Sequence, residues 1–148
     1  MMKIPAKVLI VDDEVDFVDM FSRRLQEMGQ HVKTAYSGEE ALAVLGEKAD
    51  IEVVILDIKM PGMDGMDTLA RIKHNHPLVE VIMLTGHGTI ETAVEGMKQG
   101  AYDYLLKPAD FSDIETKLEG ARQRREEQEE RIRKAEQRSL LRRSGNIY

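Results

Sequence analysis

Three acidic residues stand directly after short apolar runs, where they are placed to form a metal-binding pocket. Asp12 and Asp13 follow the run KVLIV, and Asp57 follows the run EVVIL. Three carboxylates brought together repel one another, and each would then favour its protonated form. A divalent cation among them removes that penalty, and an all-oxygen ligand set favours Mg²⁺. The chain has no cysteine, which excludes a thiolate site.

Two further polar residues follow later apolar runs, Thr85 after VEVIML and Lys107 after YDYLL. A cation beside a carboxylate favours its ionised form, so Asp57 would be a nucleophile without a general base. Its attack on a phosphoryl group brings negative charge towards negative charge. Mg²⁺ and the Lys107 ammonium would stabilise that approach, and the Thr85 hydroxyl would bond a phosphoryl oxygen in the product. The pattern predicts phosphoryl transfer to Asp57.

The positions of these side chains depend on an alternation of strand and helix signals. Apolar residues at successive positions are typical of strands buried on both faces, as in a parallel sheet covered by helices. The alternation predicts an α/β fold with an open, doubly wound, five-stranded parallel sheet of the flavodoxin-like order 2-1-3-4-5. In that order the strands before Asp12 and Asp57 are neighbours, and ligands bind at their carboxyl ends. The expected strands are 7–11, 31–35, 52–56, 79–84 and 102–106.

The helices expected between these strands have recognisable ends. Capping residues mark helix starts, and glycines that accept a positive φ mark helix ends. In the helix that precedes Gly100, Ile90, Val94 and Met97 fall on one face together with Ala93. The starts are marked by Ser37 with Glu40 three residues on, by Asp64 and by Asp110, and the ends by Gly29 and Gly100.

The chain beyond Asp110 carries no strand signal and predicts one long helix that runs without a breaker to Ser144. Its apolar positions at 114, 118 and 121 indicate packing against the domain. Arg125 and Gln128 then interrupt the seam before Ile132, which argues against a strong autonomous coiled coil. We therefore expect a folded domain over residues 1–122 and a charged helical extension or linker over residues 123–148.

Charge and hydropathy exclude several classes of function. The net charge of −6 divides into −9 over residues 1–114 and +3 over residues 115–148. An acidic domain repels nucleic acid, and the small excess in the extension does not favour direct nucleic-acid binding. No apolar run approaches the roughly 20 residues of a membrane span. The start of the chain lacks the features of a secretion signal, so the sequence predicts a cytoplasmic protein.

Four stretches of the chain resemble the receiver domain of bacterial response regulators. The resemblance covers about residues 5–122, and the four stretches occur in the family's order and spacing. The sequence motifs TGHG and GAYDYLLKP are most similar to those of receivers of the nitrogen-regulation type. The stretches are Val11–Glu14, Leu56–Gly65, Leu84–Gly88 and Gly100–Pro108.

The resemblance implies a role for each residue of the pocket. Asp57 would be phosphorylated by the phosphohistidine of a sensor histidine kinase. Asp12 and Asp13 would hold Mg²⁺ together with Asp57 and the backbone carbonyl of Lys59, and Lys107 would contact the phosphoryl group. The Lys107–Pro108 peptide bond would be cis. The only reactions catalysed would be the domain's own phosphorylation and dephosphorylation.

The resemblance also implies a conformational switch. Thr85 and Tyr104 would form the switch pair, with the ring turning inward as the hydroxyl moves to the phosphoryl group. The output surface would be the fourth helix, the fifth strand and the fifth helix. That surface or the helical extension would also serve any homodimer.

Some alternatives stay open on the sequence. A haloacid-dehalogenase-like phosphatase also forms an aspartyl phosphate, but it requires Asp-x-Asp after its first strand, where Asp12 and Asp13 are adjacent. A flavin- or nucleotide-binding module would need a glycine-rich phosphate loop there. Lys59 and His87 are either solvated side chains or control water access to the phosphoryl group. The sequence names neither the kinase nor the output partner.

Overall fold

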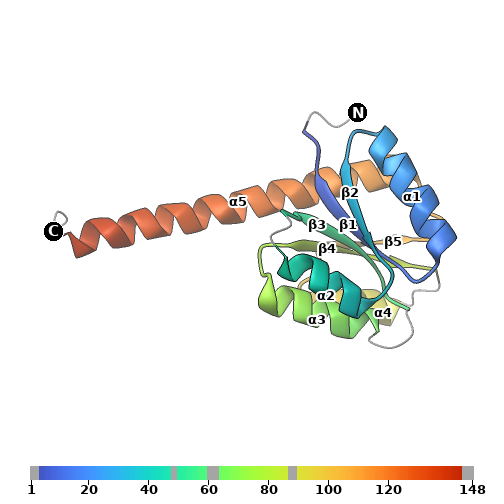
Figure 1. Ribbon diagram of the computed structural model, residues 1–148. Coiled ribbons are helices and arrows are strands. Elements are labelled where there is room, and N and C mark those ends of the chain that lie inside the picture. Colours follow the sequence, from blue (N-terminus) through green and yellow to red (C-terminus); the bar gives the residue numbers. More distant parts are fainter. Residues whose placement is uncertain (1–3, 48–49, 60–63, 87–89, 145–148) are drawn as a thin grey trace.

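Five strands form one parallel sheet in the order β2-β1-β3-β4-β5 (Figure 1). The computed structural model describes residues 4–47, 50–59, 64–86 and 90–144. The predicted sheet order is confirmed, and each predicted strand lies within one residue of an observed one. The strands are β1 (Lys7–Val11), β2 (His31–Ala35), β3 (Val53–Asp57), β4 (Glu80–Thr85) and β5 (Asp103–Leu106).

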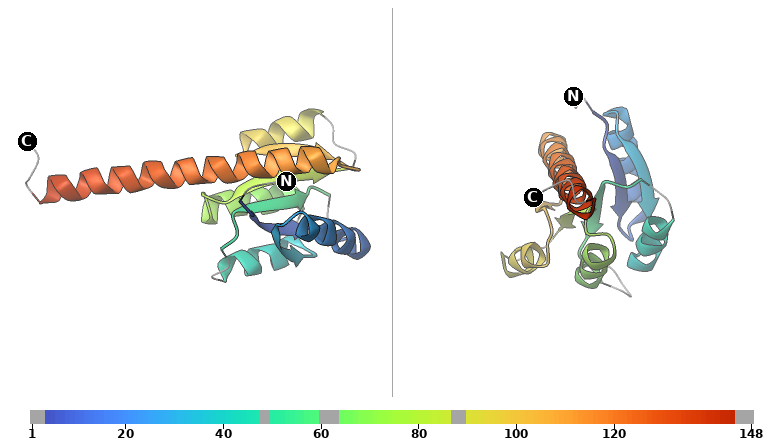
Figure 2. Two further views of the ribbon diagram at one scale, coloured as in Figure 1. Left: turned by 90° about the horizontal axis from the view of Figure 1, so that it is seen from above. Right: turned by 90° about the vertical axis from the view of Figure 1, so that its left-hand side faces the viewer.

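Helices cover both faces of the sheet because successive strand residues point to opposite sides and both sides are apolar. Leu9 and Leu56 pack with residues of α2 and α3, while Ile10 and Ile55 pack with residues of α1 and α5. The layered arrangement is visible in Figure 2. The helices are α1 (Val15–Glu27), α2 (Gly38–Gly46), α3 (Gly65–Asn75), α4 (Ile90–Lys98) and α5 (Phe111–Arg143).

The predicted helix ends are confirmed. Ser37, Asp64 and Asp110 are the N-caps of α2, α3 and α5, and each side chain accepts a hydrogen bond from an amide of the first turn. These bonds satisfy amides that have no partner within the helix. Gly29 and Gly100 follow α1 and α4 with φ of 94° and 101°, a conformation that glycine adopts without strain.

Helix α4 packs in a way that its apolar spacing did not indicate. Ile90, Val94 and Met97 share a face, but they are exposed to solvent by 85%, 46% and 42%. The buried residue of the helix is Gly96, where an added Cβ would lie only 2.0 Å from the Sδ of Met83. The methionine occupies the place that a side chain on α4 would take. The apolar face of α4 is therefore left on the surface.

Helix α5 starts as a core element and continues far beyond the sheet (Figures 1 and 2). Ile114, Leu118 and Ala121 are fully buried, as their spacing predicts. Most of the other side chains of this 33-residue helix are charged and exposed. Among the described residues, no helix is long and apolar enough to span a membrane.

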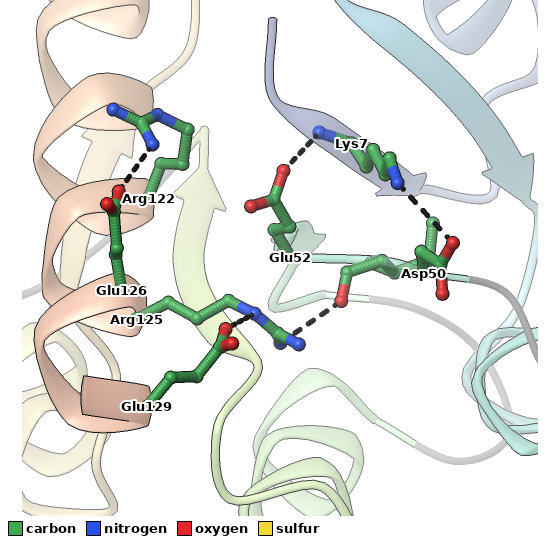
Figure 3. Close-up of polar contacts among 8 residues, drawn as sticks. Lys7, Asp50, Glu52, Arg122, Arg125, Glu126 and Glu129 are labelled. Atoms are coloured by element: carbon green, nitrogen blue, oxygen red, sulfur yellow. Dashed lines mark hydrogen bonds and ion pairs between the residues drawn. The ribbon is translucent and has the colours of Figure 1, made fainter. Parts of the chain in front are cut away.

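The contacts of α5 with the sheet extend past Arg122. Arg124 Nε lies 2.9 Å from Oε2 of the buried Glu80 at the start of β4. Arg125 donates from Nη1 to the carbonyl oxygen of Ile51, just before β3, at 3.3 Å (Figure 3). The carboxylate of Glu80 also binds the ammonium of Lys73 on α3, at 3.1 Å. The outgoing helix is thus attached to the edge of the sheet opposite the predicted pocket.

Candidate functional site

The acidic residues meet at the carboxyl edge of the sheet. Strands β1 and β3 pair with Val11 opposite Leu56, so Asp12 and Asp57 lie at the same edge. One carboxylate oxygen from each of Asp12, Asp13 and Asp57 lies within 4.8 Å of the others. Asp12 and Asp57 are buried, whereas Asp13 is exposed. The structure therefore brings together the three residues that the sequence predicted as a cluster.

The cluster fits a magnesium ion. A Mg²⁺–oxygen bond of about 2.1 Å places opposite ligands about 4.2 Å apart. The three oxygens all lie within 4.8 Å of one another, so small side-chain rotations would be enough to bring them around one ion. Asp13 is open to solvent, which suits an ion that keeps several waters. The donor set is entirely oxygen, which is the preference of a hard divalent cation.

The ammonium of Lys107 compensates part of the negative charge. Its Nζ lies 2.6 Å from Oδ2 of Asp12 and 3.6 Å from Oδ2 of Asp57, with Oε1 of Glu14 at 3.7 Å. Burial alone would lower the pKa of Lys107. The hydrogen bond to Asp12 and the charges of Asp57, Asp12 and Glu14 outweigh that effect and raise it. Lys107 therefore stays a cation in the pocket.

Asp57 has an unusual environment for a carboxylate. Its pKa is raised from 3.8 to about 6, chiefly by burial, and the nearby charge of Asp12 contributes to the rise. The backbone amide of Lys59, which donates to Oδ1 at 3.0 Å, and the charge of Lys107 lower it in part. The negative charge of the Asp57 carboxylate is therefore only partly compensated in the absence of a bound divalent cation. A divalent cation would favour its ionised, nucleophilic form.

Thr85 and Tyr104 lie on neighbouring strands but in different surroundings. Thr85 ends β4 and is buried, and its carbonyl oxygen accepts from the amide of Lys107 at 2.8 Å. Tyr104 on β5 is 40% exposed, with the ammonium of Lys117 at 5.3 Å from its ring. The ring therefore lies at the surface. The Lys107–Pro108 bond is cis, as expected.

Two neighbours of the pocket were not singled out by the sequence. A Cβ on Gly65 would lie 2.3 Å from the Cα of Ile58, so only glycine permits this approach of α3 to the residue after Asp57. Phe17 of α1 lines the cavity of about 420 Å³ that contains Asp57 and Lys107. The sequence did not indicate that Phe17, an apolar residue of α1, would line this cavity. Residues 60–63 of the motif and His87 lie outside the described residues.

Comparison with known proteins identifies close relatives of this chain. The family model for the response regulator receiver domain matches residues 8–119. The transcriptional regulatory protein ZraR of Salmonella typhimurium is 41% identical over 114 residues, which are 77% of this chain and 26% of ZraR. A putative NtrX-like response regulator of Rickettsia bellii is 48% identical over 103 residues, 68% of this chain and 21% of that protein.

A solved structure agrees with these sequence relatives. The crystal structure of a response regulator receiver domain protein from Clostridium thermocellum superposes with a TM-score of 0.78 at 40% identity. The match covers 82% of this chain and 97% of that protein. By contrast, the chain spans about a quarter of the length of the curated relatives that it matches. The likeness thus concerns one domain of those longer proteins.

Proposed function

This chain belongs to the response regulator receiver domain family, and we propose that its Asp57 accepts a phosphoryl group from a sensor histidine kinase. The observation that carries this assignment is the cluster of three carboxylates at the carboxyl edge of the sheet, with the ammonium of Lys107 against two of them. Family membership sets aside the phosphatase and the flavin-binding module. In two-component systems such a domain receives the signal, and its phosphorylated state is read by an output partner.

The chemistry follows from the positions of the charged groups. An oxygen of Asp57 attacks the phosphorus atom of the phosphohistidine, the phosphorus–nitrogen bond breaks, and its electron pair returns to the imidazole. Mg²⁺, held by Asp12, Asp13, Asp57 and the backbone carbonyl of Lys59, would neutralise charge on the transferred group. The Lys107 ammonium, 3.6 Å from Asp57, moves from the acid cluster to a phosphoryl oxygen. Asp57 needs no general base.

We propose that Thr85 and Tyr104 transmit the change. The Thr85 hydroxyl would bond a phosphoryl oxygen, and the ring of Tyr104 would move inward from its present exposed position. The apolar face of α4, with Ile90 and Val94, is exposed to solvent in this chain. A change in this surface would alter its affinity for an output partner or for a second copy of the chain. The surface formed by α4, β5 and α5 is therefore the proposed output surface.

We expect Mg²⁺ and beryllofluoride, which mimics the phosphoryl group, to act in sequence on this protein. Mg²⁺ alone should shift the amide resonances around Asp12 and Asp57, and beryllofluoride should then also shift those of α4 and β5. Asp13→Ala should weaken Mg²⁺ binding by about 10-fold or more, because it removes one charged ligand. NMR titration measures both effects. Equal Mg²⁺ affinity in the variant, or beryllofluoride shifts confined to the pocket, would contradict the metal site or the switch, respectively.

We propose that the domain boundary at residue 122 separates the receiver from a helix that links it to its output. The ion pair between Arg124 and Glu80, called the clamp below, and the hydrogen bond from Arg125 to Ile51 attach the first turn of this linking helix to the sheet. Beyond these residues Ile132 is the next apolar side chain of the interrupted seam, 44% exposed. This composition supports a marginal helix pair, with a second copy of the chain as its partner.

Two truncations separate the clamp from the rest of the extension. Chains ending after Arg122 and after Glu130 should both fold and accept a phosphoryl group at the rate of the full chain. The shorter one should be about 1–3 kcal/mol less stable, because buried Glu80 loses the guanidinium of Arg124. Urea unfolding measures the difference, and Glu80→Gln should reduce it. Equal stabilities would show that the clamp contributes nothing, and failure of both chains to fold would show that the outer helix belongs to the domain.

A further inference from the structure

The ammonium of Lys107 contacts an aromatic ring as well as the acids. Its Nζ lies 4.4 Å from the centroid of the Phe17 ring. A cation in this position is attracted by the negative face of the ring, most strongly where water is largely excluded. The side chain of Lys107 is only 17% exposed, so this condition is met. Phe17 is therefore a direct neighbour of the ammonium that contacts Asp12 and Asp57.

The Phe17 ring is itself held in place by a row of side chains. Phe21, one turn further along α1, lies 5.2 Å away between ring centroids, and Phe111 at the start of α5 lies 5.5 Å beyond it. The guanidinium of Arg24 covers Phe111 at 4.3 Å. Because Phe21 is buried, this row fixes the face that Phe17 presents to the cavity. Phe17 thus offers Lys107 a rigid surface.

Lys107 has a competing position. The carboxylate of Glu14 lies 3.7 Å from its Nζ, and the Glu14 side chain is 66% exposed. A lysine has four rotatable side-chain bonds, so its ammonium would readily follow that carboxylate outwards. Once Asp12 is engaged by a metal ion, the 2.6 Å bond that now holds the ammonium is weakened. The ring then becomes the contact that keeps Lys107 beside Asp57.

We propose that Phe17 is a positioning residue for phosphorylation: its ring holds the Lys107 ammonium over Asp57 and away from Glu14. This inference rests on the proposed function. The inference also goes beyond that function, because it assigns a role in the reaction to Phe17, an apolar residue that is neither a metal ligand nor a donor to the phosphoryl group. The role depends on the electrostatics of the ring face and not only on its bulk.

Four variants distinguish the electrostatic effect of the Phe17 ring from the effect of an apolar side chain that only occupies the same space. With Mg²⁺ and phosphoramidate, Phe17→Tyr should react within about 2-fold of the wild type, because it keeps the ring face. Phe17→Leu, which keeps an apolar wall, should react about 3- to 10-fold more slowly. Glu14→Gln combined with Phe17→Leu should recover much of the loss, because the competing charge is gone. Phe17→Met serves as a second apolar variant should the leucine variant fold poorly.

Two further readouts test the contact itself. Ring-current shifts of the Lys107 ε-methylene protons should be present in the wild type and in Phe17→Tyr and absent in Phe17→Leu. Mg²⁺ affinity, measured by calorimetry, should be the same in all three. Unchanged rates in both apolar variants, or equal losses in the leucine and tyrosine variants, would overturn the positioning role. A wild type that is not phosphorylated at all would instead overturn the proposed function.

Discussion

Asp57→Asn is expected to abolish phosphorylation of this chain. The wild type, incubated with Mg²⁺ and acetyl phosphate or phosphoramidate, should gain the mass of a single phosphoryl group, and the variant should gain none. The amide that replaces the carboxylate has no anionic oxygen to attack phosphorus, and it also removes one charge from the metal site. Intact-mass spectrometry measures the result directly.

A matched control addresses the other acids nearby. Asp16 is an exposed carboxylate in the first turn of α1, close in sequence to the cluster but outside it. Asp16→Asn should be phosphorylated as the wild type is. A full phosphoryl increment in the Asp57 variant would place the acceptor elsewhere. Loss of phosphorylation in both variants would point to a general effect of charge on the reaction.

The sheet and the acid cluster were predictable from the sequence for a common physical reason. Strands buried on both faces must be apolar at successive positions, as in Val53–Leu56, so their ends are sharply marked. The first polar residue after such a run lies at the carboxyl edge of the sheet. In the order 2-1-3-4-5 this rule places Asp12 beside Asp57, as the structure shows.

The packing of α4 and of the extension was not predictable in the same way. Apolar spacing identifies a face of a helix but not what lies against it. For α4 the deciding contact is between Gly96 and Met83, which are on different elements. The clamp joins Arg124 to Glu80 across 44 positions, and a charged helix gives no sign of which arginine will find a buried partner. Such contacts are set by the folded chain.

The position of Phe17 belongs to the same group. Its spacing from Phe21 indicates only that both lie on one face of α1. That the ring meets the ammonium of Lys107 follows from the place where β5 ends beside α1, and from the hydrogen bond between the Lys107 amide and Thr85. The roles taken from the family resemblance concern polar residues. An apolar residue that acts on a polar one is visible only in three dimensions.

The crowded carboxylates should also make the metal-free protein less stable as pH rises. The pKa of Asp57 is raised from 3.8 to about 6, chiefly by burial, so between these values the folded chain binds a proton that the unfolded chain has released. Stability therefore falls with rising pH through this window, and above about pH 6 the whole cost of the buried charge is present. The difference between a pKa of 3.8 and one of about 6 corresponds to at most about 3 kcal/mol of unfolding free energy, and solvent in the open cavity reduces this to about 1–2 kcal/mol.

Asp57→Asn should therefore stabilise the metal-free protein while it abolishes phosphorylation. We expect its advantage over the wild type to be small at pH 4, to grow up to about pH 6, and to stay at about 1–2 kcal/mol at pH 7 to 8. Saturating Mg²⁺ should reverse the order at pH 7, because only the wild type has the complete set of three carboxylates to bind it. Thermal unfolding in chelator and in Mg²⁺ across this pH range measures both effects. A variant that is less stable than the wild type in chelator at pH 7 would show that Lys107 and the amide of Lys59 already compensate the buried charge of Asp57. In that case the ionised carboxylate of Asp57 would not lower the stability of the metal-free protein.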